Sequence, residues 1–124
     1  MKSITLFSLL ICLGACQQNK IETSQSSILE ITEFNIKTEI NETFFLEMSD
    51  RLQKEFLQNR KGFKKRYLLK KDNQTYIDII EWDSKADADN ALTNATTEVC
   101  INYFACIDEI EKVKVNHHDI LKIY

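Results

Sequence analysis

The sequence predicts an α+β fold in which a four-stranded antiparallel sheet carries two helices on one face. Two observations lead to this expectation. Segments with strand-like alternation and segments with helical periodicity follow one another in the order β-α-β-β-α-β along residues 28–124. The two middle strands are separated by a short polar connection, which is typical of a hairpin. Taken together, that order is the split βαβ, or ferredoxin-like, arrangement.

The first strand and the first helix are predicted from periodicity and from one capping residue. Residues 28–37 alternate, and Phe34 lies on one face of the strand that they form. Asn41 can cap the helix that follows, because its side chain can accept a hydrogen bond from a free backbone N–H. Apolar residues then recur at helical spacing, namely Phe45, Met48, Leu52 and Phe56. We expect this helix to run to about Asn59.

The middle of the chain predicts a reversal followed by a hairpin. Gly62 is the only glycine after residue 15, so the sharp turn at the end of the first helix is expected there. The second strand is expected at residues 63–71. The third, at residues 75–82, is dense in β-branched and aromatic residues, which favour strands.

The last two elements are a helix with a small-residue face and a short strand. Ser84 and Asp87 match a capping box at the start of the helix. One helical face then consists of Ala88, Ala91, Leu92 and Ala95. Because this face consists of small residues, the helix is expected to pack closely against another part of the protein. Residues 113–117 alternate as the final strand.

The third strand is apolar on both faces. One side holds Tyr76, Ile80 and Trp82, and the other holds Ile77 and Ile79. A sheet covered by helices on one face only would expose the second set in a larger apolar patch than soluble monomers usually show. We therefore expect a second copy of the chain to cover it, which makes a homodimer.

The first residues resemble a bacterial lipoprotein signal. Lys2 supplies a positive start, residues 4–13 are apolar, and small residues immediately precede Cys16. The apolar stretch is too short to span a bilayer, which takes about 20 residues in a helix. The alternative is an ordinary secretory peptide cut after Ala15, although Leu13 fits the small-residue rule poorly.

This interpretation divides the chain into three parts. Residues 1–15 are expected to be the signal peptide. Residues 16–27 are expected to carry lipid on Cys16 and to act as a polar tether, and residues 28–124 to form one domain. A cysteine with two or three acyl chains gives stable membrane attachment. The predicted location is the bacterial cell envelope, outside the cytoplasm and held to a membrane by the lipid.

Charge and motifs exclude several kinds of partner. Without residues 1–15 the chain keeps 15 of its 16 basic side chains and all 19 acidic ones, so nucleic acid is not expected to bind. The sequence has no glycine-rich phosphate loop, no His-Glu-x-x-His and no Cys-x-x-Cys. We therefore expect no nucleotide and no metal.

Two thiols remain in the predicted domain, Cys100 and Cys106. An oxidising compartment allows a disulfide between them. Six residues of continuous helix rise about 9 Å, which is more than the roughly 7 Å between Cα atoms that a disulfide tolerates. A bridge would therefore require a break in the helix, and both a bridge and two buried free thiols are open possibilities.

The order and spacing of several short motifs resemble the antibiotic biosynthesis monooxygenase-like family of dimeric α+β barrels. These motifs are Gly62-Phe63, Trp82-Asp83-Ser84, the alanine-rich residues 86–95 and the late strand containing His117. The resemblance covers the chain from Ile28 to its end. It implies a homodimer whose sheets form a barrel, with a pocket between sheet and helices in each subunit.

The resemblance does not imply one reaction. Members of the family include cofactor-free oxygenases, haem-degrading enzymes and proteins of unknown role. The haem-degrading members depend on a tryptophan in the second helix, which this chain lacks. No cofactor is therefore expected.

Candidate site residues come from the inward faces of the strands. His117 shares a face with Val113 and Val115, and is a candidate for acid-base catalysis or ligand binding. Asp78 lies among aromatic residues, where a carboxylate can act as a base. Four aromatic residues are candidates for lining the pocket: Trp82, Tyr76, Tyr67 and Phe34. The alternative is that His117 is a hydrogen-bonded core residue and that the aromatic residues are core.

Three functions are compatible with these observations. The leading hypothesis is a lipid-anchored dimer without demonstrable enzymatic activity that binds a small apolar or aromatic ligand near Trp82 and His117. The second is a cofactor-independent monooxygenase in which Asp78 or His117 removes a proton and a dry cavity holds the substrate. The third is a structural envelope component that uses the domain for dimerisation.

Overall fold

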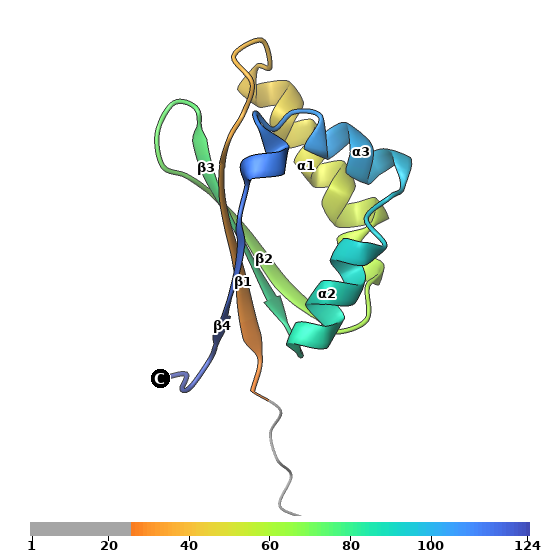
Figure 1. The fold of residues 1–124 in the computed structure, drawn as a ribbon, viewed down its shortest axis with the longest axis vertical. Coiled ribbons are helices and arrows are strands. Elements are labelled where there is room, and N and C mark those ends of the chain that lie inside the picture. Colours follow the sequence, from red (N-terminus) through yellow and green to blue (C-terminus); the bar gives the residue numbers. More distant parts are fainter. Residues whose placement is uncertain (1–25) are drawn as a thin grey trace, which may run out of the picture.

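The computed structural model describes residues 26–124, which form a sheet covered on one face by helices (Figure 1). The strands are β1 (Ile28–Asn35), β2 (Phe63–Lys70), β3 (Thr75–Trp82) and β4 (Val115–Asp119). The helices are α1 (Glu42–Glu55), α2 (Lys85–Thr93) and α3 (Glu98–Phe104), with short 3-10 turns η1 (Leu57–Asn59) and η2 (Ile110–Lys112). The predicted signal and Cys16 lie outside the described residues. No helix within them is long and apolar enough to cross a membrane.

The sheet has the order β2-β3-β1-β4, and every neighbouring pair is antiparallel. The register places Ile28 opposite Trp82 in β3, and Glu30 opposite His117 in β4. All three helices lie on the same side of the sheet (Figure 1). This architecture confirms the predicted ferredoxin-like α+β fold.

The helix caps and the turn that the sequence predicts are present in the structure. The Asn41 side chain accepts a hydrogen bond from the Phe44 amide at 2.9 Å at the start of α1. Ser84 accepts one from the Asp87 amide at 3.1 Å at the start of α2. Gly62 has a φ of 78°, a conformation that glycine adopts without steric cost.

The core lies between the sheet and the helices. Side chains of β3 alternate between buried and half-buried, and the buried set includes Tyr76, Asp78 and Trp82. Phe34 and Phe45 pack with Tyr76, with ring centroids 5.9 Å apart for Phe34–Phe45 and 4.8 Å apart for Phe45–Tyr76. Burial of these large aromatic side chains stabilises the layer.

The structure differs from the sequence prediction in the number of helices. The chain after α2 forms the separate helix α3, which packs against α1 and buries Val99, Cys100 and Tyr103. Asn94 ends α2, and Thr97 begins α3 after a short break. The segment around Cys100 is therefore a helix of its own.

Two predicted boundaries also shift. The last strand begins at Val115 and not at residue 113, because η2 occupies the approach to it and Glu109 before η2 takes a left-handed φ of 44°. The first helix ends at Glu55, and the 3-10 turn η1 continues it to Asn59.

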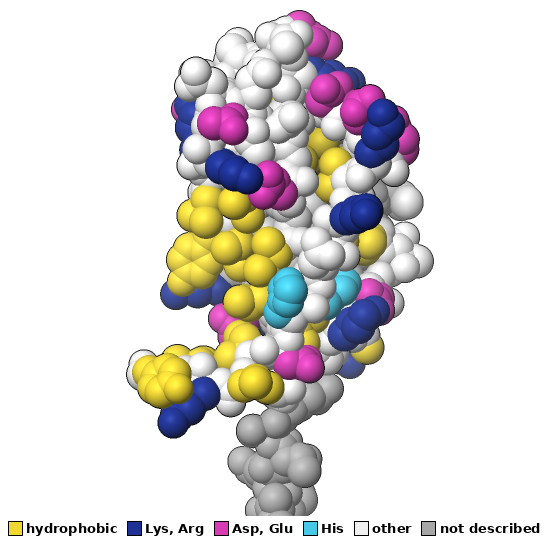
Figure 2. Space-filling model, turned by 60° about the vertical axis from the view of Figure 1, so that its left-hand side comes forward, with side chains coloured by type: hydrophobic (Ala, Val, Ile, Leu, Met, Phe, Trp, Pro, Cys, Tyr) yellow, Lys and Arg dark blue, Asp and Glu magenta, His cyan; other side chains and the backbone are white. Residues whose placement is uncertain are grey.

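The sheet face opposite the helices carries an apolar patch. Tyr67 and Leu69 of β2 are 48% and 43% exposed, and the half-buried Ile77 and Ile79 lie beside them on β3. Figure 2 shows hydrophobic side chains gathered on this side of the molecule. We call these four residues the outer patch.

Candidate functional site

A cavity of about 310 Å³ lies between the inner face of the sheet and the helices. Strands β1, β3 and β4 form one wall, and α1, α2 and α3 contribute to the other. Ala88 and Ala91 of α2 border it with methyl groups only, so the small-residue face of this helix leaves the space open. Most of the other lining side chains are aliphatic or aromatic, among them Leu52, Phe56, Ile80 and Phe104. Such a cavity suits an apolar molecule.

One end of the cavity is polar because Glu30 and His117 meet there. Glu30 lines the cavity, and its Oε2 atom lies 2.9 Å from His117 Nε2 on the neighbouring strand. Their side chains are only 14% and 17% exposed. Burial raises the pKa of Glu30, and the opposing effect of His117, which favours the carboxylate, does not cancel this rise. Glu30 therefore holds a proton more readily than an exposed glutamate.

Trp82 borders the same end of the cavity. Its side chain is buried, and its indole Nε1 atom makes no hydrogen bond to any described residue. The indole also favours the charged form of Glu30, although it does not reach ordinary hydrogen-bonding geometry with that carboxylate. A buried N–H donor without an acceptor lowers stability, and the nearby Glu30 carboxylate offsets part of that cost.

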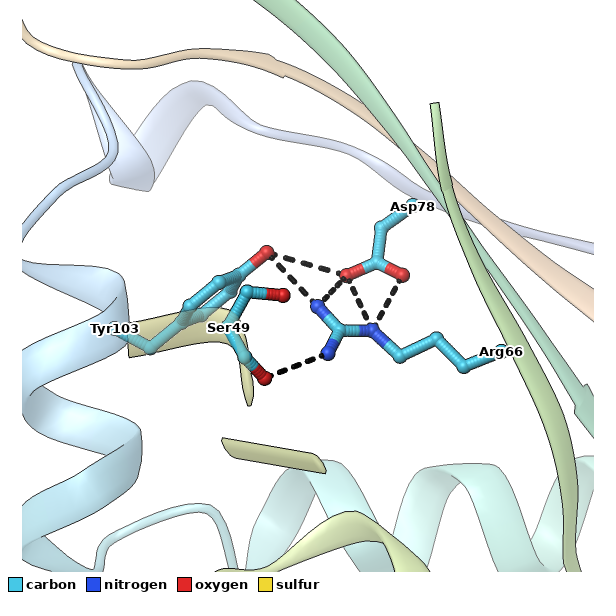
Figure 3. Close-up of polar contacts among 4 residues, drawn as sticks. All are labelled: Ser49, Arg66, Asp78 and Tyr103. Carbon is cyan, nitrogen blue, oxygen red and sulfur yellow. Dashed lines mark hydrogen bonds and ion pairs between the residues drawn. The ribbon is translucent and has the colours of Figure 1, made fainter. Parts of the chain in front are cut away.

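A second polar group, two of whose members line the cavity, joins four elements (Figure 3). Arg66 of β2 donates from Nε to Asp78 Oδ1 at 2.8 Å, and from Nη2 to Asp78 Oδ2 at 2.7 Å. Its Nη1 donates to the main-chain oxygen of Ser49 in α1 at 3.1 Å. The Tyr103 hydroxyl of α3 accepts from Arg66 and donates to Asp78, both at 3.2 Å. We call these four residues the Arg66 cluster.

The Arg66 cluster changes how Asp78 is interpreted. The carboxylate lines the cavity, but two nitrogens of Arg66 and the Tyr103 hydroxyl already occupy it. Burial and the nearby Asp78 charge raise the pKa of Tyr103 well above its usual value, so its hydroxyl stays a donor. Asp78 is thus held as an ion-pair partner, whereas the expected role was that of a base.

The other candidate residues separate into two groups. Phe34 and Trp82 line the cavity. Tyr76 lies behind it, against Phe34 and Phe45, and donates its hydroxyl to Glu42 at 2.7 Å. His117 reaches the site through Glu30 and is not among the lining residues.

Tyr67 was expected in the pocket, and the structure corrects this. The register of β2 against β3 places it opposite Ile79, on the sheet face away from the helices. A side chain of the opposite strand face cannot reach the cavity.

Both candidate disulfide residues are free thiols. Cys100 lies in α3 and lines the cavity, and Thr97 donates to its sulfur at 3.2 Å. Cys106 follows the end of α3, and burial raises its pKa. Helix α3 continues from Glu98 to Phe104, so it separates the two sulfurs along its axis.

Sequence reasoning missed three residues of this region: Glu30, Arg66 and Tyr103. The signal for Glu30 is its strand parity, because it alternates in step with Phe34, which was expected to line the pocket. The partnership of Glu30 with His117 depends on the β1–β4 register, which joins residues far apart in the chain. Among the described residues no group of three or more His, Cys, Asp or Glu could hold a metal ion.

Comparison with known proteins supports the fold. No protein-family model matches the chain, and no curated protein matches it. Among solved structures, SnoaB, a cofactor-independent oxygenase from Streptomyces nogalater, is similar with a TM-score of 0.58 at 15% identity, over 80% of this chain and 95% of that one. A Nitrosomonas europaea protein provisionally described as an antibiotic biosynthesis monooxygenase gives 0.62 at 14% identity, over 78% and 92%.

A third similar structure is a dimeric ferredoxin-like protein from an uncultured marine organism. Its TM-score is 0.59 at 16% identity, over 83% of this chain and 95% of that one. Identities this low show a shared fold and leave the reaction open. The chain therefore has the ferredoxin-like fold found in antibiotic biosynthesis monooxygenase-like proteins.

Proposed function

We propose that this domain binds a small apolar or aromatic molecule in the cavity between sheet and helices. The observation that carries the proposal is the cavity itself, about 310 Å³ of space with a largely apolar lining. Interiors are normally packed with few voids larger than a water molecule, so an opening of this size is unusual. The alanines of α2 preserve it.

The cavity does not favour a purely structural role. A domain used only for dimerisation gains stability when its interior is filled, because empty space forfeits packing interactions. Larger side chains at Ala88 and Ala91 would supply that filling.

We further propose that the domain works at the bacterial cell envelope as a lipid-anchored homodimer. The pattern before Cys16 supports the anchor. The outer patch and the dimeric ferredoxin-like protein of the same fold support the dimer. Two lipidated subunits would attach more firmly than one, through avidity.

A cofactor-independent oxygenase is the second candidate. Its support is the fold shared with SnoaB and the presence of a carboxylate with a raised pKa at the cavity wall. In this alternative Glu30 takes the role of base that was first assigned to Asp78 or His117. A phenolic substrate would lose its proton to Glu30, and its anion would then reduce molecular oxygen directly. Oxygen uptake with phenols, abolished in Glu30→Gln, would support this activity.

The binding proposal is tested by filling the cavity. Ethylbenzene is a suitable probe, and NMR can follow the indole N–H of Trp82, the only tryptophan of the chain. Ala91→Leu places extra carbon atoms in the cavity and should weaken ethylbenzene binding at least tenfold. Ala88→Val serves as a second filling variant if Ala91→Leu does not fold.

The matched control is Ala86→Leu, because Ala86 lies on the exposed side of the same helix. It should leave binding unchanged. Saturable binding to the unmodified protein that survives both filling variants would place the ligand elsewhere. Absence of any binding by the unmodified protein would refute the proposal.

A further inference from the structure

We propose that residues 120–124, which follow β4, form a second membrane contact beside the lipid anchor, with their apolar side chains inserted into the surface of the bilayer. We call these residues the β4 extension. This contact rests on the proposed lipid anchor at Cys16 and deepens it, because it names the part of the folded domain that touches the membrane. It is supported by the exposure, the composition and the position of the β4 extension.

The β4 extension carries large apolar side chains that no other described part of the chain covers. Leu121, Ile123 and Tyr124 are 93%, 80% and 104% exposed. The next most exposed large hydrophobic residue of the described chain is Ile101, at 58%. A single exposed apolar side chain is ordinary on a protein surface, whereas neighbouring ones mark a site of contact with another molecule or with a membrane.

The composition of the β4 extension suits the boundary between headgroups and acyl chains. Tyrosine is enriched there because its ring is apolar and its hydroxyl is polar. The Lys122 ammonium lies 4.7 Å from the centroid of the Tyr124 ring. A lysine beside such a ring can bury its alkyl stem and keep its charge among the headgroups. Five residues are too few to cross a bilayer, so this contact is confined to the membrane surface.

The β4 extension leaves the sheet beside the start of β1 (Figure 1). The Ile120 amide donates to the main-chain oxygen of Ser27 at 2.9 Å, which joins the two segments. Cys16 precedes Ser26 by ten positions in the sequence, a length of chain that spans at most about 35 Å. A lipid on Cys16 therefore keeps the β4 extension within reach of the bilayer.

Attachment at Cys16 favours the bilayer over a second copy of the chain as the occupant. A short apolar segment binds a membrane weakly by itself, but the anchor makes its insertion an intramolecular step with a high effective concentration of lipid. The outer patch lies on β2 and β3, whereas the β4 extension follows the strand at the other edge of the sheet. Pairing of two outer patches therefore does not by itself account for the β4 extension.

The charges at this end of the molecule do not require an anionic membrane. Lys64 donates to the Ser27 hydroxyl at 2.7 Å, and so lies beside the start of β1. It also pairs with Glu81 at 3.4 Å and with Asp83 at 3.8 Å, so positive and negative side chains are mixed there. We therefore expect the contact to be apolar and to form on zwitterionic lipid.

The test measures the depth of residue 124 in phosphatidylcholine vesicles that carry the full lipidated chain. Tyr124→Trp adds a tryptophan to the buried Trp82, and the unmodified protein supplies the background emission. The vesicles contain either ordinary lipid or lipid brominated near the headgroup end of its acyl chains. We expect the added emission to shift to shorter wavelength in both. It should lose roughly half its intensity or more in brominated vesicles, because interfacial segments lie about 5–10 Å deep.

The matched control is Ile101→Trp, because Ile101 is also an exposed apolar residue but belongs to α3, at the other end of the molecule (Figure 1). Its emission should resemble that of tryptophan in water and should not be quenched by bromine. Adding Leu121→Asp and Ile123→Asp to Tyr124→Trp should abolish the quenching while the chain still floats with the vesicles. Circular dichroism should show an unchanged fold, since both substituted side chains are exposed.

The outcomes separate this contact from the proposed anchor. Quenching that persists with both aspartates would overturn the contact, because the tether alone would then bring residue 124 to the lipid. Emission at short wavelength that bromine does not quench would place residue 124 against a second copy of the chain, and would also overturn it. Emission typical of water, from a chain that floats with the vesicles, would overturn the contact and leave the anchor standing. An unmodified chain that carries no lipid would refute the anchor, and the contact with it.

Discussion

Asp78 is a carboxylate in an aromatic layer whose partners give it a structural role. Its side chain and that of Arg66 are 9% and 6% exposed, so the ion pair is screened very little by water. The guanidinium also binds α1 through Ser49 and α3 through Tyr103. The Arg66 cluster thus ties the sheet to two helices at one point.

Removing Arg66 should therefore destabilise the fold strongly. In Arg66→Met the Asp78 carboxylate would stay buried without a compensating charge, and we expect the free energy of unfolding to fall by about 3–5 kcal/mol. Urea denaturation followed by circular dichroism measures this. The double variant Arg66→Met/Asp78→Leu should recover most of the loss, because both charges are then absent. A single variant as stable as the unmodified protein would show that the cluster contributes little.

Glu30 and Asp78 show what residue-level reasoning can and cannot supply. Alternation along β1 and β3 was enough to place Phe34, Asp78 and Trp82 on inward faces. It did not reveal that Arg66 binds the Asp78 carboxylate or that His117 binds that of Glu30. Both contacts cross strand pairs, and no local pattern encodes the register of those pairs. Glu30 was missed for this reason, although its position four residues before Phe34 places both side chains on the same face of β1.

The turn into β2 brings the backbone at Gly62 close to the start of α2. A Cβ atom added at Gly62 would lie 2.3 Å from Asp87 Oδ2 and 2.6 Å from Asp87 Cβ, at the capped start of α2. Asp87 is itself held by Ser84, whose hydroxyl donates to Oδ2 at 2.9 Å. The carboxylate therefore cannot move away without losing its hydrogen bond to Ser84.

Gly62→Ala should lower the free energy of unfolding by about 2 kcal/mol or more, since backbone strain at positive φ adds to this overlap. Thermal unfolding measures the effect. Gly62→Asn separates the two causes, because asparagine tolerates the left-handed conformation but still carries Cβ. It should remain clearly destabilised. Recovery to the stability of the unmodified protein would mean that strain alone matters at this turn.

Elements governed by local signals were predicted well, and those governed by packing were not. Caps at Asn41 and Ser84 and the turn at Gly62 are each encoded within a few residues. Helix α3 is seven residues long, and its N-cap residue Thr97 makes no capping hydrogen bond through its side chain. Such a short helix is stabilised mainly by packing, here against α1, so no local pattern of residues predicts it.

At the scale of the whole molecule, the outer patch should drive association. Ile79 lies on the face away from the helices, and Tyr67 lies opposite it on β2. Ile79→Lys would place a charge in an interface formed sheet to sheet. We expect light scattering to report a dimer for the domain without its lipid and a monomer for this variant.

Asn90→Lys is the control for added charge, because Asn90 is exposed on α2, on the other side of the molecule. It should remain dimeric, and circular dichroism should confirm that both variants are folded. A monomer in the unmodified protein at micromolar concentration would contradict the account of the outer patch. A dimer that persists in Ile79→Lys would place the interface on another surface.

The two buried thiols in and after α3 allow local opening of this part of the chain to be measured by thiol labelling. Cys100 and Cys106 are 0% and 1% exposed, so a thiol reagent can reach them only when this part of the chain opens. At saturating reagent, where labelling is faster than reclosing, the rate of labelling under native conditions equals the rate at which α3 separates from α1. Because Cys100 also borders the cavity, that rate is the rate at which the cavity wall opens. A ligand that enters through this wall cannot bind faster than the wall opens.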